Sequence, residues 1–210
     1  MGRTVYLIRH AKSEANVRQL YGTDMPLSEE GLKQAKDTAN ILNINPDLVI
    51  SGTKKRQMQT ANILFPEKYK YDTTPVFDEI YFGDLENVAI GDEARDIIDN
   101  ILLIQTMHNG DNVWERAENA LRYILNTEYL QTVKTSVILT SDTLMEAMII
   151  KLVHGKVNDM IWAGKYHIDN CQCIYITVDD DIGAEDANGF NKITGLYIDN
   201  VNILPNGAKQ

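Results

Sequence analysis

The chain has 210 residues, of which 44% are hydrophobic and 24% charged, and its formal net charge is −10. These proportions are ordinary for a globular fold, so we expect a single domain over residues 1–210. The acidic balance disfavours nucleic acid and anionic membrane as partners, and any anionic ligand would need a local cluster of cations.

The first half of the chain alternates strand-like and helix-like segments. Residues 4–8 (TVYLI) and 47–51 (DLVIS) are short apolar runs of strand length. Residues 28–42 carry apolar side chains at helical spacing behind Ser28, a plausible N-cap, and residues 54–64 repeat that spacing. We therefore predict two strands that alternate with two helices.

The second half continues this alternation. A helix should follow Asn112, whose segment NVWE resembles a capping box, and should bury apolar side chains up to Leu125. Residues 143–155 predict a second, almost wholly apolar helix that ends at Gly155. Three further strands are predicted over residues 136–140, 173–178 and 193–198.

Strands that alternate with helices predict a three-layer α/β/α fold around an open, mostly parallel sheet. In such sheets, ligands bind beyond the carboxyl ends of the strands. The residues that follow the three clearest strands should then face one crevice: Arg9 and His10, Ser51 with the turn that carries Arg56, and Thr140 to Asp142.

Two arginines beside one imidazole would bind a phosphate dianion well. Arg9 and Arg56 can each donate two parallel hydrogen bonds, and His10 can act as a nucleophile or as an acid–base group. The alternative is that both arginines are surface residues and that His10 only ends a strand.

The segment LIRHAKSEAN (residues 7–16) resembles the signature of the histidine phosphatase superfamily, which is also called the phosphoglycerate mutase-like family. Further segments agree with that family in order and spacing. They are PLSEEG (26–31), LVISGTKKRQMQTANIL (48–64), DEIYFGDLEN (78–87) and VILTSDTLMEAMIIKLVHG (137–155).

The resemblance implies a role for each matching residue. His10 would accept the phosphoryl group, while Arg9 and Arg56 would bind its oxygens. Glu79 would protonate the leaving oxygen and later activate water. The alternative is that Glu79 belongs to a solvated loop, because three more acids lie close by: Asp78, Asp84 and Glu86.

Other positions match the family's pocket less strongly. Asn16 would support the phosphate pocket, and Ser13 and Gly22 would line it. The segment 88–112 would form a helical lid that selects the substrate. The resemblance implies no metal and no cofactor.

The family has a second histidine after the strand that corresponds to residues 136–140. Here Ser141 stands at that position in an ungapped alignment, and Asp142 stands there if one gap is allowed. Either residue removes a donor that can be positively charged, and a carboxylate would repel phosphate unless it is paired or protonated. None of the other histidines, His108, His154 and His167, is an evident substitute.

Two neighbours of His10 also differ from the family pattern. Ala11 replaces a glycine, which would cost about 1 kcal/mol if the backbone there were left-handed. Lys12 stands where an acid is frequent, and it could either add positive charge to the pocket or face solvent.

The expected function is hydrolysis of phosphomonoesters through a phosphohistidine, with weak or specialised activity and a small phosphorylated metabolite as substrate. The alternative is an inactive relative that binds a phosphorylated ligand or a partner. A phosphoglycerate mutase is disfavoured, because such enzymes resemble this chain only with longer segments after residue 87.

The sequence also bears on location and on cysteine chemistry. No apolar run approaches the roughly 20 residues of a membrane span, and the N-terminal MGRT leads directly into a strand, so we expect a cytoplasmic protein. Cys171 and Cys173 lie on one face of an extended run, which disfavours a disulfide, and a metal site there is improbable without further cysteines.

Overall fold

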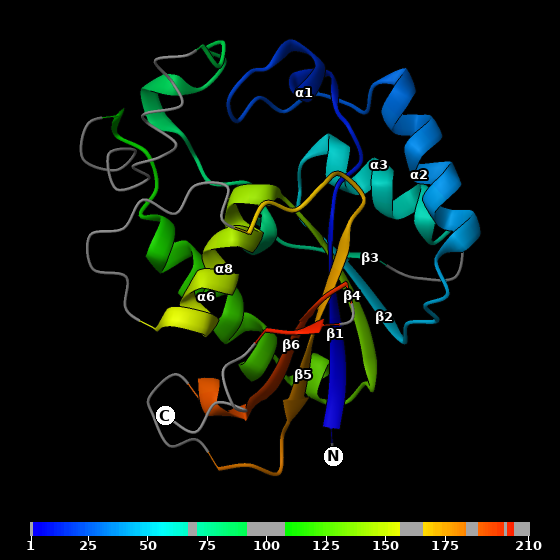
Figure 1. Ribbon diagram of the computed structural model, residues 1–210, viewed down its shortest axis with the longest axis vertical. Helices are drawn as coiled ribbons and strands as arrows, with labels where there is room; N and C mark the ends of the chain where they lie inside the picture. The colour runs from blue at the N-terminus through cyan, green and yellow to red at the C-terminus, as the bar shows by residue number, and fades with distance from the viewer. Residues whose placement is uncertain are drawn as a thin grey trace.

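A computed structural model describes residues 2–66, 71–91, 108–155, 166–183, 189–199 and 201–203. Within these ranges the chain forms a seven-stranded sheet in the order β3-β2-β4-β1-β5-β6-β7 (Figure 1). The strands are β1 (Gly2–Arg9), β2 (Leu48–Ser51), β3 (Tyr71–Thr73), β4 (Thr135–Thr140), β5 (Cys173–Asp179), β6 (Ile193–Ile198) and β7 (Val201–Asn202).

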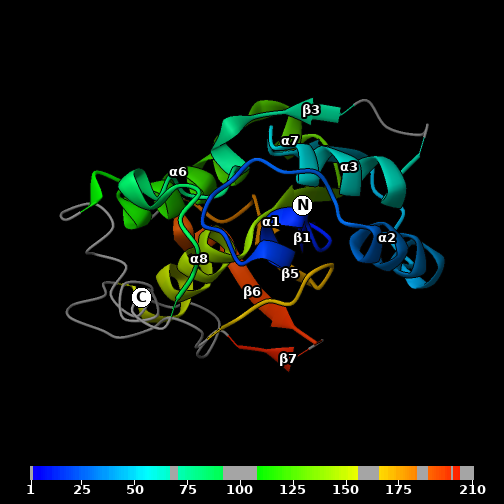
Figure 2. The ribbon, with the colours of Figure 1, turned by 90° about the horizontal axis from the view of Figure 1, so that it is seen from above.

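Helices cover both faces of this sheet. They are α1 (Glu14–Arg18), α2 (Glu29–Ile41), α3 (Lys55–Leu64), α6 (Val113–Asn126), α7 (Glu128–Gln131) and α8 (Asp142–His154), with 3-10 turns η1 (Pro75–Phe77), η2 (Gly83–Leu85) and η3 (Phe190–Lys192). Helices α6 and α8 lie on one side of the sheet, and α2 and α3 lie on the other (Figures 1 and 2). The predicted three-layer α/β fold is confirmed.

Each face of the sheet has its own apolar core. On one face, Leu7 and Ile138 pack among buried side chains of α6 and α8, such as Leu121 and Met148. On the other face, Ile8, Val137 and Leu139 pack against α3. The alternation of these side chains along β1 and β4 is what allows both faces to be covered.

The sheet is mixed. β3, β2, β4 and β1 pair in parallel, whereas β5, β6 and β7 pair antiparallel to their neighbours. All five predicted strands form, while the short strands β3 and β7 were not predicted. Because β5 is antiparallel to β1, it begins where β1 ends, and Cys173 pairs with Ile8. The residues that precede β5 therefore lie at the same edge as the residues that follow β1.

The carboxyl ends of β2, β4 and β1 lie side by side, as predicted. Ser51 pairs with Leu139, and Arg9 pairs with Thr140. The single domain over 1–210 and the lid over 88–112 stay predictions, and residues 92–107 of the lid lie outside the described residues. None of the described helices has the length and apolar character needed to cross a bilayer.

A buried arginine ties the opposite end of β1 to its neighbours. Arg3 is 4% exposed, and its Nε and Nη2 donate to the Asp180 carboxylate at 2.8 and 3.2 Å. Its Nη1 donates to the carbonyl of Ile124 at 3.0 Å, so one side chain links β1, the turn after β5 and α6.

Removal of this side chain should destabilise the fold. Arg3→Ala leaves the Asp180 carboxylate and a buried carbonyl without their donor, and we expect a loss of about 3 kcal/mol in the free energy of unfolding. The control Arg122→Ala removes a partly exposed ion pair with Glu118, which keeps its second partner Lys151, and should cost less than about 0.5 kcal/mol. Urea denaturation measures both, and equal losses in the two variants would contradict the assignment.

Candidate active site

His10 follows β1 directly and is 2% exposed. Its backbone N–H donates to the carbonyl of Thr140 at 3.0 Å, which fixes it beside the end of β4. The ring Nδ1 lies 2.8 Å from the carbonyl of Ala11. Since a carbonyl can only accept, Nδ1 carries the proton, and the lone pair of the neutral ring is on Nε2.

Arg56 meets that lone pair. Its Nε lies 3.0 Å from His10 Nε2 and donates to it, and its Nη1 donates to the carbonyl of Thr23 at 2.8 Å. Arg56 lies in the first turn of α3 and is 3% exposed. The predicted contact between a guanidinium and this imidazole is therefore present.

The surroundings of His10 keep its ring neutral. Burial lowers the pKa of His10 well below its ordinary value of 6.5, and the positive charges of Arg56 and Arg9 lower it further. The hydrogen bond to Ala11 opposes this shift. A neutral buried imidazole with an in-plane lone pair is the form of histidine that can act as a nucleophile.

Arg9 ends β1 and is 8% exposed. Its Nη1 lies 3.1 Å from Oδ2 of Asp142 and also donates to the carbonyl of Ile168. Its Nε is buried and has no hydrogen-bond partner among the described residues. A buried N–H without an acceptor is costly, so this atom is suited to receive an oxyanion. We call the group formed by His10, Arg9 and Arg56 the anion site.

Glu79 is electrostatically coupled to both arginines of the anion site. Burial of its carboxylate raises its pKa, and Asp142 raises it too, while Arg56, the backbone N–H of Ile80 and Arg9 lower it. Glu79 as a whole residue is partly exposed. A carboxyl group that stays protonated to higher pH can act as a general acid.

The three acids near Glu79 accept hydrogen bonds from groups outside the anion site. Asp78 accepts hydrogen bonds from the backbone N–H and the hydroxyl of Thr53. Glu86 accepts from the N–H of Phe82, and Asp84 accepts from a side-chain amide. The contacts of Asp78 also fix the segment that carries Glu79 against the start of α3.

Two buried polar side chains that the sequence analysis did not single out hold the site together. Thr60 accepts from the backbone N–H of Ala11 at 3.0 Å and donates to the carbonyl of Arg56 at 2.7 Å, so it couples the two segments of the anion site. Gln57 donates to the carbonyl of Phe77 and to the hydroxyl of Ser141. The sequence signal that could have identified Gln57 and Thr60 is their position in the same helix, one and four residues after Arg56.

Ser13 and Asn16 form a capping box at the start of α1. The Ser13 hydroxyl and backbone N–H both donate to Oδ1 of Asn16, and Ser13 Oγ accepts from the Asn16 backbone. Gly22 has φ of 61°, and a side chain there would collide with Glu86. These contacts are structural, and the predicted pocket roles of Ser13, Asn16 and Gly22 stay predictions.

Ser141 and Asp142 point to different neighbours. Ser141 is fully buried and accepts from Gln57 at 3.0 Å. Asp142, the first residue of α8, contacts Arg9 and accepts from the backbone N–H of Ile168 at 3.2 Å. Of the two residues, Asp142 is therefore the one whose side chain contacts the anion site.

The two unusual neighbours of His10 are accommodated simply. Ala11 is not among the described residues with positive φ, so it incurs no left-handed penalty, and its methyl group is buried. Lys12 pairs with Glu30 on α2 at 2.7 Å, away from His10.

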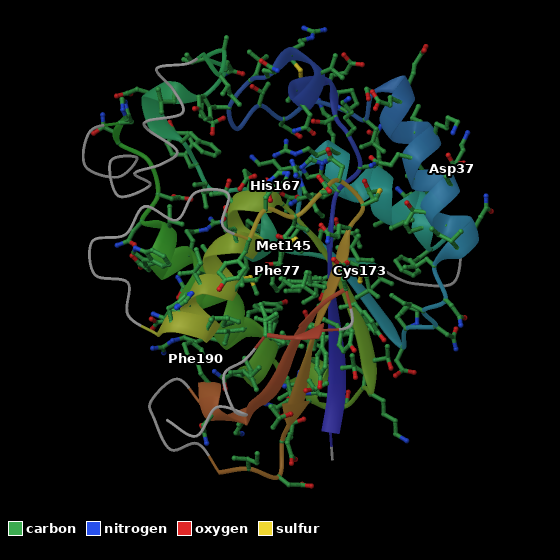
Figure 3. The ribbon with its side chains drawn as sticks, viewed as in Figure 1. Asp37, Phe77, Met145, His167, Cys173 and Phe190 are labelled. Atoms are coloured by element: carbon green, nitrogen blue, oxygen red, sulfur yellow. The ribbon has the colours of Figure 1, made fainter. Side chains whose placement is uncertain are left out.

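His167 also lies at this edge, which the sequence analysis did not anticipate. Its Nδ1 is 3.1 Å from Oδ2 of Asp142, the same oxygen that contacts Arg9. Figure 3 labels His167 near the N-terminal end of α8 and the end of β1. The strand that follows it, β5, lies inside the described sheet, between β1 and β6. Among the described residues no cluster of His, Cys, Asp or Glu is arranged to hold a metal ion.

Comparison with known proteins agrees with this geometry. The family model of the histidine phosphatase superfamily (branch 1) matches residues 5–186. An adenosylcobalamin/alpha-ribazole phosphatase of Salmonella typhimurium is 35% identical over 86 residues, which are 39% of this chain and 43% of that protein. The chain thus matches less than half the length of this relative.

Two longer matches cover most of the chain. The adenosylcobalamin/alpha-ribazole phosphatase of Escherichia coli is 23% identical over 170 residues, or 75% of this chain and 82% of that protein. The crystal structure of a phosphoglycerate mutase from Bacillus anthracis superposes with a TM-score of 0.69 at 19% identity and covers 91% of this chain and 95% of its own. The latter shows the fold alone.

The protonation state of His10 can be measured directly. In a pH titration followed by the ring nitrogen signals in NMR, wild-type His10 should remain neutral at pH values where a free imidazole, with its pKa near 6.5, is half protonated. Arg56→Met removes one of the two nearby positive charges and should raise the pKa of His10. Arg122→Met, at a partly exposed position of α6, is the matched control and should leave the pKa of His10 unchanged. A wild-type His10 that titrates at 6.5 or above would contradict the neutral nucleophile.

Proposed function

Because this chain belongs to branch 1 of the histidine phosphatase superfamily, we propose that it is a phosphomonoester hydrolase that acts through a phosphohistidine at His10. The observation that carries the proposal is the neutral, buried imidazole whose Nε2 lies 3.0 Å from the guanidinium of Arg56. A nucleophile and a cation that binds phosphate oxygens are thus adjacent. The phosphatase activity of the named relatives supports the same reaction class.

In the first step, Nε2 of His10 attacks the phosphorus atom and forms a P–N bond while the P–O bond to the alcohol breaks. The Arg56 N–H that occupies the lone pair must first transfer its hydrogen bond to a phosphate oxygen. Glu79 donates its proton to the leaving oxygen, which supports its assignment as the general acid because its pKa is raised.

In the second step, the Glu79 carboxylate removes a proton from water, and the resulting hydroxide attacks the phosphohistidine. The P–N bond breaks, inorganic phosphate leaves, and His10 regains its lone pair. Arg9 and Arg56 bind the phosphoryl oxygens in both steps and stabilise the charge of the transition state. The mechanism uses protein groups alone.

We propose a small phosphorylated metabolite as the substrate, in line with the alpha-ribazole phosphate chemistry that the names of the relatives indicate. The net charge of −10 supports a small ligand held by local arginines over a polyanion. A cytoplasmic location is part of the proposal, and the free thiols of Cys171 and Cys173 support it.

One observation favours the alternative of a binding protein without turnover. The Asp142 carboxylate lies against Arg9 and engages one arm of the guanidinium. An anion at this place weakens the attraction for a phosphate dianion. The two experiments below separate catalysis from binding.

Hydrolysis of an aryl phosphate should depend on His10. His10→Ala removes the nucleophile, and we expect kcat/KM to fall at least about 1,000-fold. The control His154→Ala changes a histidine at the far end of α8 and should keep wild-type activity. Equal rates for wild type and His10→Ala would refute the enzyme, and phosphate binding without turnover would identify the binding protein.

The role of Glu79 depends on the leaving group. Nitrophenolate leaves without a proton, so Glu79→Gln should still form the phosphohistidine from nitrophenyl phosphate. Hydrolysis of that phosphohistidine should be at least about 100-fold slower than in the wild type, which gives a burst of nitrophenol. With an alkyl phosphate the first step should fail as well. Asp84→Asn, which alters a nearby acid outside the anion site, is the control. Phosphorylated His10 should be detected by mass spectrometry, and its absence in Glu79→Gln together with normal turnover would exclude Glu79 as acid and base.

A further inference from the structure

One carboxylate oxygen joins a buried arginine to an exposed histidine at the anion site. Oδ2 of Asp142 lies 3.1 Å from Nη1 of Arg9 and 3.1 Å from Nδ1 of His167. Its other oxygen, Oδ1, accepts from the backbone N–H of Ile168. The Asp142 side chain is 21% exposed and that of His167 is 53% exposed, so the pair lies between the buried site and solvent.

The Asp142 carboxylate opposes phosphate binding in two ways. Its negative charge repels a dianion at a short distance. Its contact with Nη1 also competes with phosphate oxygens for Arg9, because an N–H directed at a carboxylate is not available to a second acceptor. A site that binds phosphate through Arg9 therefore needs a means of offsetting this charge.

His167 can supply that offset. A protonated ring donates Nδ1–H to Oδ2 of Asp142 as a charged donor, and such bonds are stronger than neutral ones. The carboxylate is then neutralised from the solvent side, and its hold on Arg9 weakens. A neutral ring can still donate one hydrogen bond but brings no charge.

We propose that His167 is a positioning residue whose protonated ring neutralises Asp142 and so frees Arg9 to bind an oxyanion. The inference rests on the proposed function only in taking the anion site as the place where phosphate binds. It adds a residue from the segment before β5 to the site and makes anion affinity depend on one proton.

The direction of the pH dependence follows from the charged groups nearby. His167 faces Asp142 through Nδ1 and Asp169 through Nε2, at 3.5 Å, and Arg9 lies beyond Asp142. Asp142 is also coupled to Glu79. Anion binding should be tighter with a protonated than with a neutral His167, and so should weaken as the pH rises.

Inorganic sulfate is a suitable probe, because it remains a dianion over this range while phosphate itself titrates. We expect the wild-type dissociation constant for sulfate, measured by calorimetry, to rise about tenfold between about pH 5.5 and about pH 8. His167→Asn keeps a neutral donor toward Asp142 but cannot take up a proton. It should bind sulfate weakly at both pH values and lose most of this change.

Asp142→Asn gives the complementary result. Its amide oxygen can still accept from Ile168, but the charge is gone, so sulfate should bind tightly at both pH values. The double variant should then behave as Asp142→Asn does, since His167 acts only through that carboxylate. Glu79, whose pKa is raised, contributes equally to the wild type and to His167→Asn, so the difference between the two belongs to His167.

His154→Asn is the matched control. His154 Nε2 lies 3.1 Å from the hydroxyl of Tyr166, the residue before His167, so this variant tests whether a general disturbance of the segment has the same effect. It should retain the wild-type change with pH. A wild-type pH response in His167→Asn, or its loss in His154→Asn, would overturn the inference. Sulfate binding needs no turnover. If the His10→Ala comparison showed that the protein is no phosphatase, the sulfate measurements would therefore still test the role of His167.

Discussion

The hydrogen bond from Arg56 to His10 sets the conditions for the rest of the structure. A guanidinium cannot give up its proton at any ordinary pH, so its N–H directed at Nε2 keeps the imidazole neutral and its lone pair localised. The two partners come from segments 46 residues apart in sequence. Thr60 joins these segments through backbone atoms on both sides, and the contacts of Asp78 hold the acid-bearing segment against the same helix. The buried contacts of Thr60 and Asp78 therefore help to position the hydrogen bond between Arg56 and His10.

Two buried arginines need hydrogen-bond acceptors or negative charge to offset the loss of hydration. The partial pairing of Arg9 and Arg56 leaves positive charge for a ligand. Arg56 is met by a carbonyl and by the imidazole, and its nearby carboxylates act only through electrostatic coupling. Arg9 is met by a carbonyl and by Asp142, while its Nε has no partner among the described residues. Full pairing with carboxylates would neutralise both cations and leave no attraction for a ligand. The net charge of the chain is −10, yet screening confines that repulsion to short range, so local geometry decides which anion binds.

The sequence predicted the fold and the centre of the site because both depend on local patterns. Apolar runs marked five strands, and the rule that ligands bind beyond the ends of parallel strands brought together Arg9, His10 and Arg56. That rule also explains what was missed. It considers the residues that follow a strand, whereas β5 is antiparallel to β1, so the residues that precede β5 reach the site. Strand direction depends on the path of the whole chain, and no local signal placed His167 beside Asp142. Side-chain pairs such as Ser13 with Asn16 are similarly invisible, because a motif residue can serve a helix cap or a ligand equally well.

The position of Asp142 is linked to the segment 166–172, which leads into β5 at the edge of the sheet where β1 ends. This segment bonds to β1 through Cys171 and Gln172 and to His10 through Asn170, so its position relative to the nucleophile is fixed by backbone and side-chain contacts. A carboxylate at the start of α8 favours the helix, because negative charge there interacts well with the helix dipole, but it is unfavourable for phosphate. An imidazole brought in by the returning segment reconciles the two demands, since it adds positive charge beside the carboxylate without adding a permanent cation to the pocket. A lysine there would add a lasting positive charge beside the product phosphate, whereas a histidine can carry its charge or lose it.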